Sequence, residues 1–254
     1  MNATLLLDYD NVYPTSATAP TLELVTHDLS EMMMLATRSQ PGTKAVHVRV
    51  YGGWTEGGTL TRRASEVLQT LPTASFFPLI GAGGTIVGGT VGLAHGLALH
   101  PEFTLGDTYV RRLGPPQVRL QRAIPAGCVA GSDHCPARIL RAFTYRGNRR
   151  CPVDGCNVQS SDAFVTHEQK MVDGLMACDL LGLSRLGNPG EDTVGIVTSD
   201  RDLLPAVVAA AQMRSASVAV IALTGGWHSP DIDVIRAAGA DYFGEEEIGS
   251  GRVP

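Results

Sequence analysis

Short apolar runs alternate with stretches of helical spacing along most of this chain, and that alternation restricts the fold more than any other feature of the sequence. The runs that are typical of strands cover residues 5–7, 45–51, 74–80, 194–198 and 218–223. Helical spacing covers residues 21–38, 60–71, 202–213 and 229–239. Thr166 and Gln169 have the spacing of a capping box, which predicts a further helix from residue 166 to about 183. Such an alternation predicts an α/β fold with a parallel sheet that is flanked by helices and linked by right-handed crossovers.

The pattern changes between residues 81 and 160, which are rich in glycine, arginine and cysteine. Glycines punctuate a β-like stretch up to residue 99, and further β-like pieces cover residues 109–113 and 117–124. We therefore interpret residues 81–160 as a β-rich insertion that zinc could stabilise. Residues 1–80 and 161–254 then form a single α/β domain around it.

The basic residues are distributed unevenly. The formal net charge is −5, which by itself argues against a nucleic-acid partner. Between Arg111 and Arg150, however, there are nine arginines and a single acidic residue, Asp133. This asymmetry is typical of an acidic body with a basic arm that contacts phosphates, although a solvated arginine-rich surface would have the same composition. Arg146, Arg149 and Arg150 are expected to bind a nucleic-acid substrate.

The sequence also bears on where the protein works. No apolar run approaches the roughly 20 residues that a membrane-spanning helix needs, and the residues after Met1 are typical of a strand rather than a signal peptide. We therefore expect a cytoplasmic protein without a membrane partner. Disulfides are rare in that compartment, so the five cysteines need another role.

Acidic residues follow two of the predicted strands at the point where each strand ends. Asp8 and Asp10 follow the first run, and Ser199, Asp200 and Asp202 follow the run at 194–198. Because the carboxyl ends of parallel strands meet at one edge of a sheet, these carboxylates are expected to lie close together. Clustered carboxylates repel one another unless a hard cation neutralises them. The alternative interpretation is that Asp10 and Asp202 cap helices.

The helix predicted after Thr166 adds two more acids. Asp179 falls within the apolar arc of that helix, where a carboxylate must be hydrogen-bonded, paired or metal-bound. Asp173 lies at the border of the arc, and Lys170 precedes it by three residues. Lys170 is expected either to pair with Asp173 on the surface or to face a phosphate.

Four segments of the chain resemble, in order, the motifs of the NYN domain family of PIN-like nucleases. Residues 6–11 are similar to its hydrophobic-Asp-x-x-Asn opening, and residues 170–173 with Asp179 resemble its Lys-x-Val-Asp helix and second Asp. Residues 198–205 resemble its Ser-x-Asp-x-Asp-Phe-x-Pro-type motif, with Leu203 in place of the aromatic residue, and residues 240–243 resemble its closing segment. The resemblance implies a PIN-like (Rossmannoid) α/β nuclease that usually acts on RNA with Mg²⁺ or Mn²⁺. The insertion has no counterpart in that pattern.

The resemblance and the chemistry of oxygen ligands together suggest a role for each residue. The expected ligands of Mg²⁺ or Mn²⁺ are Asp8, Asp173, Asp179, Asp200 and Asp202. Within this set, Asp173 is expected to bind the ion or orient the attacking water, and Asp179 to serve a second ion or support the first. Asn11 and Ser199 are expected to orient Asp8 or contact a phosphate, and Lys170 to contact the substrate.

Two other functions fit parts of the same pattern. Residues 8–12 also resemble the Asp-x-Asp-x-Thr/Val opening of haloacid-dehalogenase-like phosphatases, with Asp8 as nucleophile and Asp10 as acid. That reading leaves Asp173 and Asp179 unexplained. The second alternative is a catalytically silent NYN-type RNA-binding protein, although silent members are expected to lose acids and here each acid of the pattern is present.

Four of the five cysteines gather within 29 residues of the insertion: Cys128, Cys135, Cys151 and Cys156. In a cytoplasmic protein this grouping predicts a structural Zn²⁺ site, although the gaps are wider than the usual two residues. His134 is an alternative to Cys135, and unconnected buried thiols are the alternative to zinc. Cys178, on the predicted helix, is interpreted as a small core residue.

Overall fold

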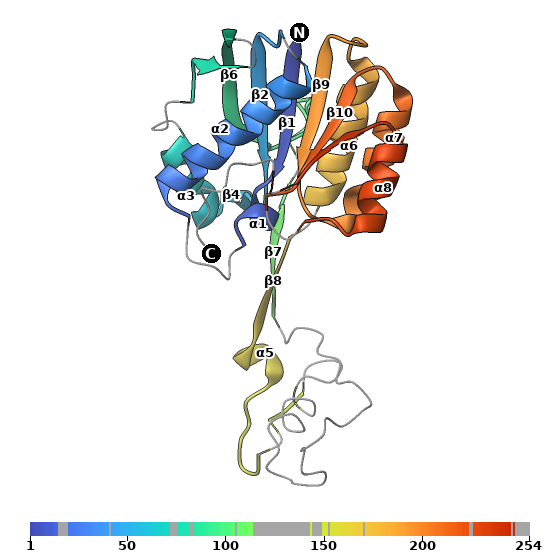
Figure 1. The fold of residues 1–254 in the computed structure, drawn as a ribbon. Coiled ribbons are helices and arrows are strands. Elements are labelled where there is room, and N and C mark those ends of the chain that lie inside the picture. The colour runs from blue at the N-terminus through green and yellow to red at the C-terminus, as the bar shows by residue number, and fades with distance from the viewer. Residues whose placement is uncertain are drawn as a thin grey trace. The chain divides into compact units, whose positions relative to one another are not determined.

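The computed structural model describes residues 1–14, 20–40, 42–71, 76–81, 84–104, 106–113, 143, 149–151, 153–169, 171–223, 226–244 and 246. The chain divides into two compact units. The larger one consists of Met1–Thr108 and Lys170–Pro254, and the smaller one of Tyr109–Gln169. The larger unit has the expected α/β fold, in which a sheet lies between two layers of helices (Figure 1).

The larger unit is built on a seven-stranded, mostly parallel sheet. In sheet order its strands are β11 (Asp241–Phe243), β10 (Ser217–Ile221), β9 (Asp192–Val197), β1 (Asn2–Asp8), β2 (Ala45–Tyr51), β6 (Ile86–Leu93) and β5 (Leu79–Ile80). Neighbouring strands pair in parallel except β5 and β6, which are antiparallel. β1 lies at the centre, where Leu7 is opposite Val50 of β2 on one side and Val197 of β9 on the other.

Helices cover both faces of the sheet because its central strand is apolar on both sides. α2 (Leu22–Ser39) and α3 (Arg62–Thr70) pack on the face that carries Leu5 and Leu7. α6 (Val172–Leu186), α7 (Leu204–Met213) and α8 (Ser229–Ala237) pack with Leu6 on the opposite face. Successive residues of β1 thus contribute to two separate cores, as the pleat of a strand requires.

Local sequence signals explain where several elements begin. α2 and α3 each start after a threonine whose hydroxyl accepts an N–H of the first turn, Thr21 for α2 and Thr61 for α3. α7 carries Pro205 at its first turn, where the missing N–H costs no helical hydrogen bond. The hairpin of β3 (Thr55–Glu56) and β4 (Thr59–Leu60) turns at Gly57 and Gly58, which both have positive φ angles.

The glycine-rich stretch at 86–93 belongs to the sheet, which corrects the expectation that the insertion begins at residue 81. This stretch is β6, and it pairs in parallel with β2. A Cβ atom at Gly89 would lie 1.8 Å from the carbonyl oxygen of Val46 and 2.7 Å from the ring of Phe77. The glycine therefore permits a close approach inside the sheet rather than marking a loop. The smaller unit accordingly starts at Tyr109 and ends at Gln169.

Residues 165–169 form a strand, so the helix predicted from Thr166 is wrong at its start. This strand, β8 (Val165–Gln169), pairs antiparallel with β7 (Tyr109–Leu113), and Thr166 lies opposite Arg112. Pairing with a segment far away in the sequence overrides the local capping pattern. α6 begins only at Val172, after Met171, whose φ of 63° lies in the left-handed region.

In the smaller unit, the described residues form the β7–β8 pair, a bridge between Arg150 and Gln159, and the short helix α5 (Ser160–Ala163). β7 agrees with the strand predicted at 109–113, whereas the strand predicted at 117–124 lies outside the described residues. Within the part of the chain that the structure describes, no helix is long and apolar enough to cross a membrane.

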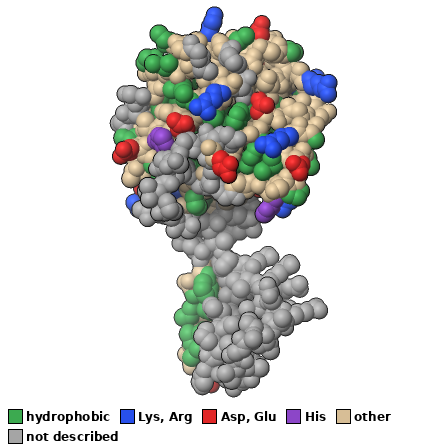
Figure 2. All heavy atoms as spheres, in the orientation of Figure 1, with side chains coloured by type: hydrophobic (Ala, Val, Ile, Leu, Met, Phe, Trp, Pro, Cys, Tyr) green, Lys and Arg blue, Asp and Glu red, His purple; other side chains and the backbone are tan. Residues whose placement is uncertain are grey.

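Acidic and basic side chains are interspersed on the face of the larger unit that Figure 2 shows. Its described side chains form no continuous basic area there. The described side chains of this face therefore provide no surface that would attract phosphates by its charge alone.

Candidate metal centre

The sheet has a switch point between β1 and β9, where the chain leaves two neighbouring strands in opposite directions. From β1 it passes through α2 to β2, and from β9 through α7 to β10 on the other side. In open parallel sheets, ligands bind beyond the carboxyl ends of the strands at such a point. Asp8 is the last residue of β1, and residues 198–202 follow β9 directly.

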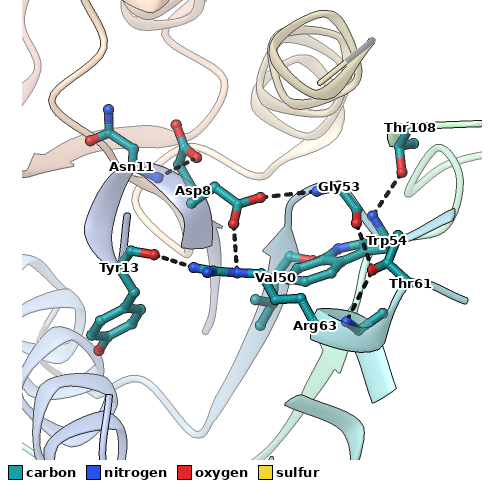
Figure 3. A network of polar contacts seen from close by, with 11 residues as sticks. Asp8, Asn11, Tyr13, Val50, Gly53, Trp54, Thr61, Arg63 and Thr108 are labelled. Carbon is teal, nitrogen blue, oxygen red and sulfur yellow. Dashed lines mark hydrogen bonds and ion pairs between the residues drawn. The ribbon is translucent and has the colours of Figure 1, made fainter. Parts of the chain in front are cut away.

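Asp8 is buried at this edge, with 4% of its surface exposed. One carboxylate oxygen accepts a hydrogen bond from the Asn11 N–H at 3.2 Å, as Figure 3 shows, and the other accepts from the Thr198 hydroxyl at 3.0 Å. Burial, with smaller contributions from the charges of Asp173 and Asp10, raises the pKa of Asp8 to about 7, although both hydrogen bonds lower it. At neutral pH this carboxyl is therefore close to the midpoint of its titration.

Thr198 links the two acid-bearing segments. Its hydroxyl donates to Asp8 and accepts from the Asp200 N–H at 3.0 Å, so one side chain is bonded to both. The backbone carbonyl of Thr198 accepts from the indole N–H of Trp227 at 2.9 Å. Both tryptophan and threonine are buried, which keeps this link away from water.

Asn11 makes a second link between the same segments. Its backbone N–H binds Asp8, and its side-chain oxygen accepts from the Ser199 N–H at 2.9 Å. The next residue, Asp200, accepts from the Asp202 N–H at 2.9 Å and so caps the 3₁₀ turn η3 (Arg201–Leu203). The capping role considered for Asp202 thus belongs to Asp200, and the turn presents both acids from one short segment.

Asp173 brings a third segment to the site from the first turn of α6. Partial burial raises its pKa, and the charges of Asp200 and Asp202 raise it further. Asp173 also raises the pKa of Asp8. The four acids therefore form one electrostatically coupled group, which runs from buried Asp8 through half-buried Asp200 to exposed Asp173 and Asp202.

These carboxylates share an electrostatic field without being gathered into a ligand shell. Among the described residues, no three His, Cys, Asp or Glu side chains lie close enough together to hold one ion. Like charges at this separation disfavour closer approach. The donor set itself, oxygen atoms of four carboxylates, suits a hard divalent cation.

Asp179 is hydrogen-bonded and paired, which are two of the three outcomes expected for a carboxylate on the apolar arc of the helix. Its side chain is buried, as its place in the apolar arc predicts. One oxygen accepts from the Ala98 N–H at 2.7 Å, and the other from the Tyr51 hydroxyl at 2.6 Å and the Arg49 guanidinium at 3.1 Å. Because both oxygens accept hydrogen bonds from groups of the protein, we do not assign Asp179 to the metal-binding set, and its role as a ligand stays a prediction. The network instead ties α6 to β2 and to the segment after β6.

Asp10 is also directed to a partner outside the acidic group. It forms an ion pair with Arg63 at 2.7 Å and accepts from the Gly53 N–H at 3.0 Å. The side chain that caps the short helix at residues 9–12 is that of Asp8. The Arg63 guanidinium partly compensates the negative charge of Asp10, and in this respect Asp10 differs from the four acids of the coupled group.

Some of the other predicted site residues belong to the part of the chain that the structure describes, and others do not. Lys170, Arg146, Cys128 and Cys135 lie outside the described residues. The backbone of Arg150 forms a β-bridge with Gln159, and the backbone N–H of Arg149 donates to the Ser160 hydroxyl at 3.1 Å. The side chains of both arginines are exposed.

The described cysteines give a mixed result for the zinc prediction. Cys151 and Cys156 are half-buried, and the Cys156 N–H closes a turn by donating to the Val153 carbonyl at 3.1 Å. The zinc site itself stays a prediction. Cys178 is exposed, so its interpretation as a core residue is wrong. It precedes buried Asp179 on α6, and a step of one residue turns a side chain by about 100° around a helix.

Sequence reasoning missed Thr198 and Trp227 as parts of the site. Thr198 had a usable signal, because a hydroxyl residue directly after a buried strand stands at the functional edge of the sheet. Trp227 had none, since its contact with Thr198 joins segments that are separated by a helix and a strand.

No protein-family model matches this chain, and no curated protein sequence matches it significantly. The resemblance to NYN domains accordingly rests on the four motifs and their order.

Proposed function

We propose that this protein is a PIN-like nuclease of the NYN type that uses Mg²⁺ or Mn²⁺ to hydrolyse phosphodiester bonds in RNA. The observation that carries the proposal is the electrostatic coupling of Asp8, Asp173, Asp200 and Asp202, which come from three separate segments near the switch point of the sheet. Asp173 raises the pKa of Asp8, and Asp200 and Asp202 raise the pKa of Asp173. Among the described residues, none of the four acids has an ion-pair partner. A divalent cation would supply the missing positive charge.

Asp8, Asp200 and Asp202 are the residues that would hold the ion, and Asp173 completes the group. A bound ion of this kind polarises the scissile phosphate and makes a bound water more acidic. The residues of the protein then have distinct tasks. Asn11 and Thr198 hold the carboxylate of Asp8 in place, and the raised pKa of Asp173 suits a group that accepts the proton of the attacking water.

RNA is proposed as the substrate for two reasons. The motif resemblance points to a family that usually acts on RNA, and the nine arginines between Arg111 and Arg150 provide charge for phosphates. The described side chains of the larger unit form no continuous basic area on the face seen in Figure 2. We therefore assign phosphate binding mainly to the arginine-rich segment, with Arg149 and Arg150 as its described members.

The phosphatase alternative is disfavoured by the partners of Asp10. In that mechanism Asp10 must carry a proton to the leaving group. Its carboxylate instead pairs with Arg63 and accepts from the Gly53 N–H, and both partners stabilise the ionised form. An acid held as an anion in this way is a poor proton donor.

Metal binding is expected to depend on pH through Asp8. Its pKa of about 7 means that a proton must leave before a cation can bind below neutral pH. The Mg²⁺ concentration at which Tm begins to rise should fall about tenfold per pH unit up to pH 7 and then level off. Thermal unfolding at several Mg²⁺ concentrations between pH 5.5 and 8 measures this dependence. A threshold concentration that does not change with pH would be inconsistent with Asp8 as a ligand.

Zinc is expected in the smaller unit, at about one ion per chain after dialysis without a strong chelator. Cys151→Ser and Cys156→Ser should each lower that content, because loss of one thiolate opens a four-ligand site. Cys178→Ser is the matched control, since Cys178 is exposed and lies in the larger unit. Elemental analysis measures the metal. Protein that contains no zinc and has five freely titratable thiols in its native state would rule the site out.

The proposed function is tested by incubating the full chain with end-labelled RNA and DNA of the same sequence, with Mn²⁺ or with EDTA. Cleavage of RNA that requires Mn²⁺ and disappears in Asp200→Asn is the expected result. Binding of RNA without any metal-dependent cleavage would instead establish the silent RNA-binding alternative. A covalent phosphate on Asp8 after incubation with a phosphomonoester would establish the phosphatase.

A further inference from the structure

The turn that follows Asp8 is held from outside the acidic group by one arginine. This turn is α1 (Tyr9–Val12), and Arg63 lies in the first turn of α3. Arg63 pairs with Asp10 through its Nε atom, donates to the backbone carbonyl of Tyr13, and places its guanidinium 5.0 Å from the centre of the Tyr9 ring. A single side chain thus contacts three residues of one turn, as the contacts of Arg63 and Tyr13 in Figure 3 illustrate.

The segment that follows β2 is also held in place, by hydrogen bonds of Gly53 to Asp10 and Thr61. The Gly53 N–H donates to Asp10, while the Gly53 carbonyl accepts from the Thr61 hydroxyl at 2.8 Å. Thr61 also caps α3. A Cβ atom at Gly52 would lie 2.8 Å from the Asp10 carboxylate, so the backbone packs directly against this acid. α1, the segment after β2 and the start of α3 therefore form one interlocked assembly.

This assembly borders the acidic group through Asn11. Asn11 belongs to α1, and it binds Asp8 with its backbone N–H and Ser199 with its side-chain oxygen. Any displacement of α1 must therefore change the position of Asp8 relative to the turn after β9. The interactions of Arg63 with Tyr9, Asp10 and Tyr13 oppose that displacement.

We propose that Arg63 is a positioning residue of the acidic site, which acts through Asp10 and α1 to hold Asn11 between Asp8 and Ser199. This inference rests on the proposed metal-dependent nuclease function. Arg63 takes no part in the chemistry and contacts none of the four acids. Its effect is to keep Asp8 aligned with Asp200 and Asp202, so that one cation can reach all of them.

The chain provides a matched control on the same helix. Arg62 is the neighbour of Arg63 and forms an ion pair with Glu66 at the same distance, 2.7 Å. The side chain of Arg62 is 93% exposed, whereas that of Arg63 is 24% exposed. An exposed i,i+4 ion pair contributes little to stability. Among the described residues, Arg62 has Glu66 as its ion-pair partner, and Glu66 does not contact the acidic group in any way that the ion pair would transmit. Arg62→Gln and Arg63→Gln therefore change the same atoms and the same charge, and differ in the connection to α1.

The experiment compares the full chain with Arg62→Gln, Arg63→Gln, Arg63→Lys and Asp10→Asn at a temperature well below every Tm. Mn²⁺ binding is measured by electron paramagnetic resonance, and cleavage of labelled RNA gives kcat, KM and the Mn²⁺ concentration for half-maximal activity. For Arg63→Gln we expect kcat to fall and the Mn²⁺ midpoint to rise, each by about tenfold or more, with KM for RNA within about twofold of wild type. Arg62→Gln should match wild type within about twofold in every quantity.

Arg63→Lys should recover part of the Mn²⁺ affinity, because it keeps the charge beside Asp10 but loses the planar set of donors. Asp10→Asn should show a smaller loss of the same kind, since it keeps the acceptor for Gly53 and removes the ion pair. If Arg63→Gln does not fold, the outcome is decided by these two variants. A purely structural role would lower Tm and leave the Mn²⁺ midpoint unchanged in the folded protein.

The possible failures are distinguishable. Wild type that cleaves RNA with Mn²⁺, together with folded Arg63 or Asp10 variants of unchanged kcat and Mn²⁺ affinity, overturns the positioning role alone. Wild type that binds Mn²⁺ but does not cleave overturns the nuclease, and Mn²⁺ affinity then decides the role of Arg63. Wild type that does neither overturns both.

Discussion

Asp8→Asn is expected to abolish metal-dependent cleavage while it raises the thermal stability of the metal-free protein. Loss of activity follows because the variant lacks the most buried carboxylate of the proposed metal site. A bound metal ion contributes several kcal/mol to the stabilisation of the transition state, so a decrease in kcat of at least about 100-fold is expected.

The gain in stability follows from the sign of the pKa shift. The folded protein holds the proton of Asp8 up to about pH 7, whereas the unfolded chain loses it near its ordinary pKa of 3.8. Stability therefore falls as the pH rises between these two values. Each pH unit between them contributes about 1.4 kcal/mol, so above pH 7 the ionised carboxyl costs about 4 kcal/mol. Asparagine at this position removes that cost. It also loses one of the two hydrogen bonds of Asp8, which costs about 1 kcal/mol, so the free energy of unfolding should rise by about 3 kcal/mol.

Unfolding of wild type and variant at pH 8 in buffer without divalent metal measures this gain, which corresponds to an increase in Tm of roughly 6–12 °C. Asp233→Asn is the control, because Asp233 is exposed on α8 and should change neither Tm nor kcat. A lower Tm for Asp8→Asn at pH 8 would mean that Asp8 is a satisfied structural acid rather than an uncompensated one.

Asp179→Ala is expected to have the opposite effect on stability. It leaves Arg49 without its ionic partner, and it leaves the Tyr51 hydroxyl and the Ala98 N–H without their acceptor. Removing one member of a buried ion pair costs about 3–5 kcal/mol, which lowers Tm by roughly 10 °C or more in a chain of this size.

The two aspartates can therefore be told apart by one type of measurement. If Asp179 were a ligand in the acidic group, its removal would relieve repulsion and raise Tm in metal-free buffer, as for Asp8→Asn. Calorimetry of Asp179→Ala beside Asp233→Ala at pH 8 provides the comparison. Mg²⁺ should still raise the Tm of Asp179→Ala by as much as it raises that of wild type. A loss of that response would return Asp179 to the metal-binding set.

The order of strands and helices could be predicted well because it depends on local spacing. The runs at 45–51, 194–198 and 218–223 coincide with β2, β9 and β10 to within a few residues. Asp8 and Asp200 could be placed at one edge for the same reason, since parallel strands align their carboxyl ends. These predictions needed no knowledge of which segments meet.

The predictions that failed depend on partners far away in the sequence. Thr166 has a good local signal for a helix start, but its segment pairs with β7. For Asp179 the sequence showed that a buried acid needs a partner, and only the fold reveals that Arg49 and Tyr51 are its partners. The glycine-rich β-like stretch that contains β6 was assigned to the insertion, whereas β6 pairs with β2 and Gly89 allows a close contact with Val46 of that strand.

The central claim is that Asp8, Asp173, Asp200 and Asp202 together bind one divalent cation. Electron paramagnetic resonance tests this claim most directly, because only free Mn²⁺ gives the sharp solution signal and bound Mn²⁺ no longer contributes to it. At pH 7.5 we expect about one Mn²⁺ per wild-type chain, and a loss of affinity of at least about tenfold in Asp200→Asn, with Asp233→Asn equal to wild type. Wild-type protein that binds no Mn²⁺, or that binds it as tightly after Asp200→Asn, would contradict the claim.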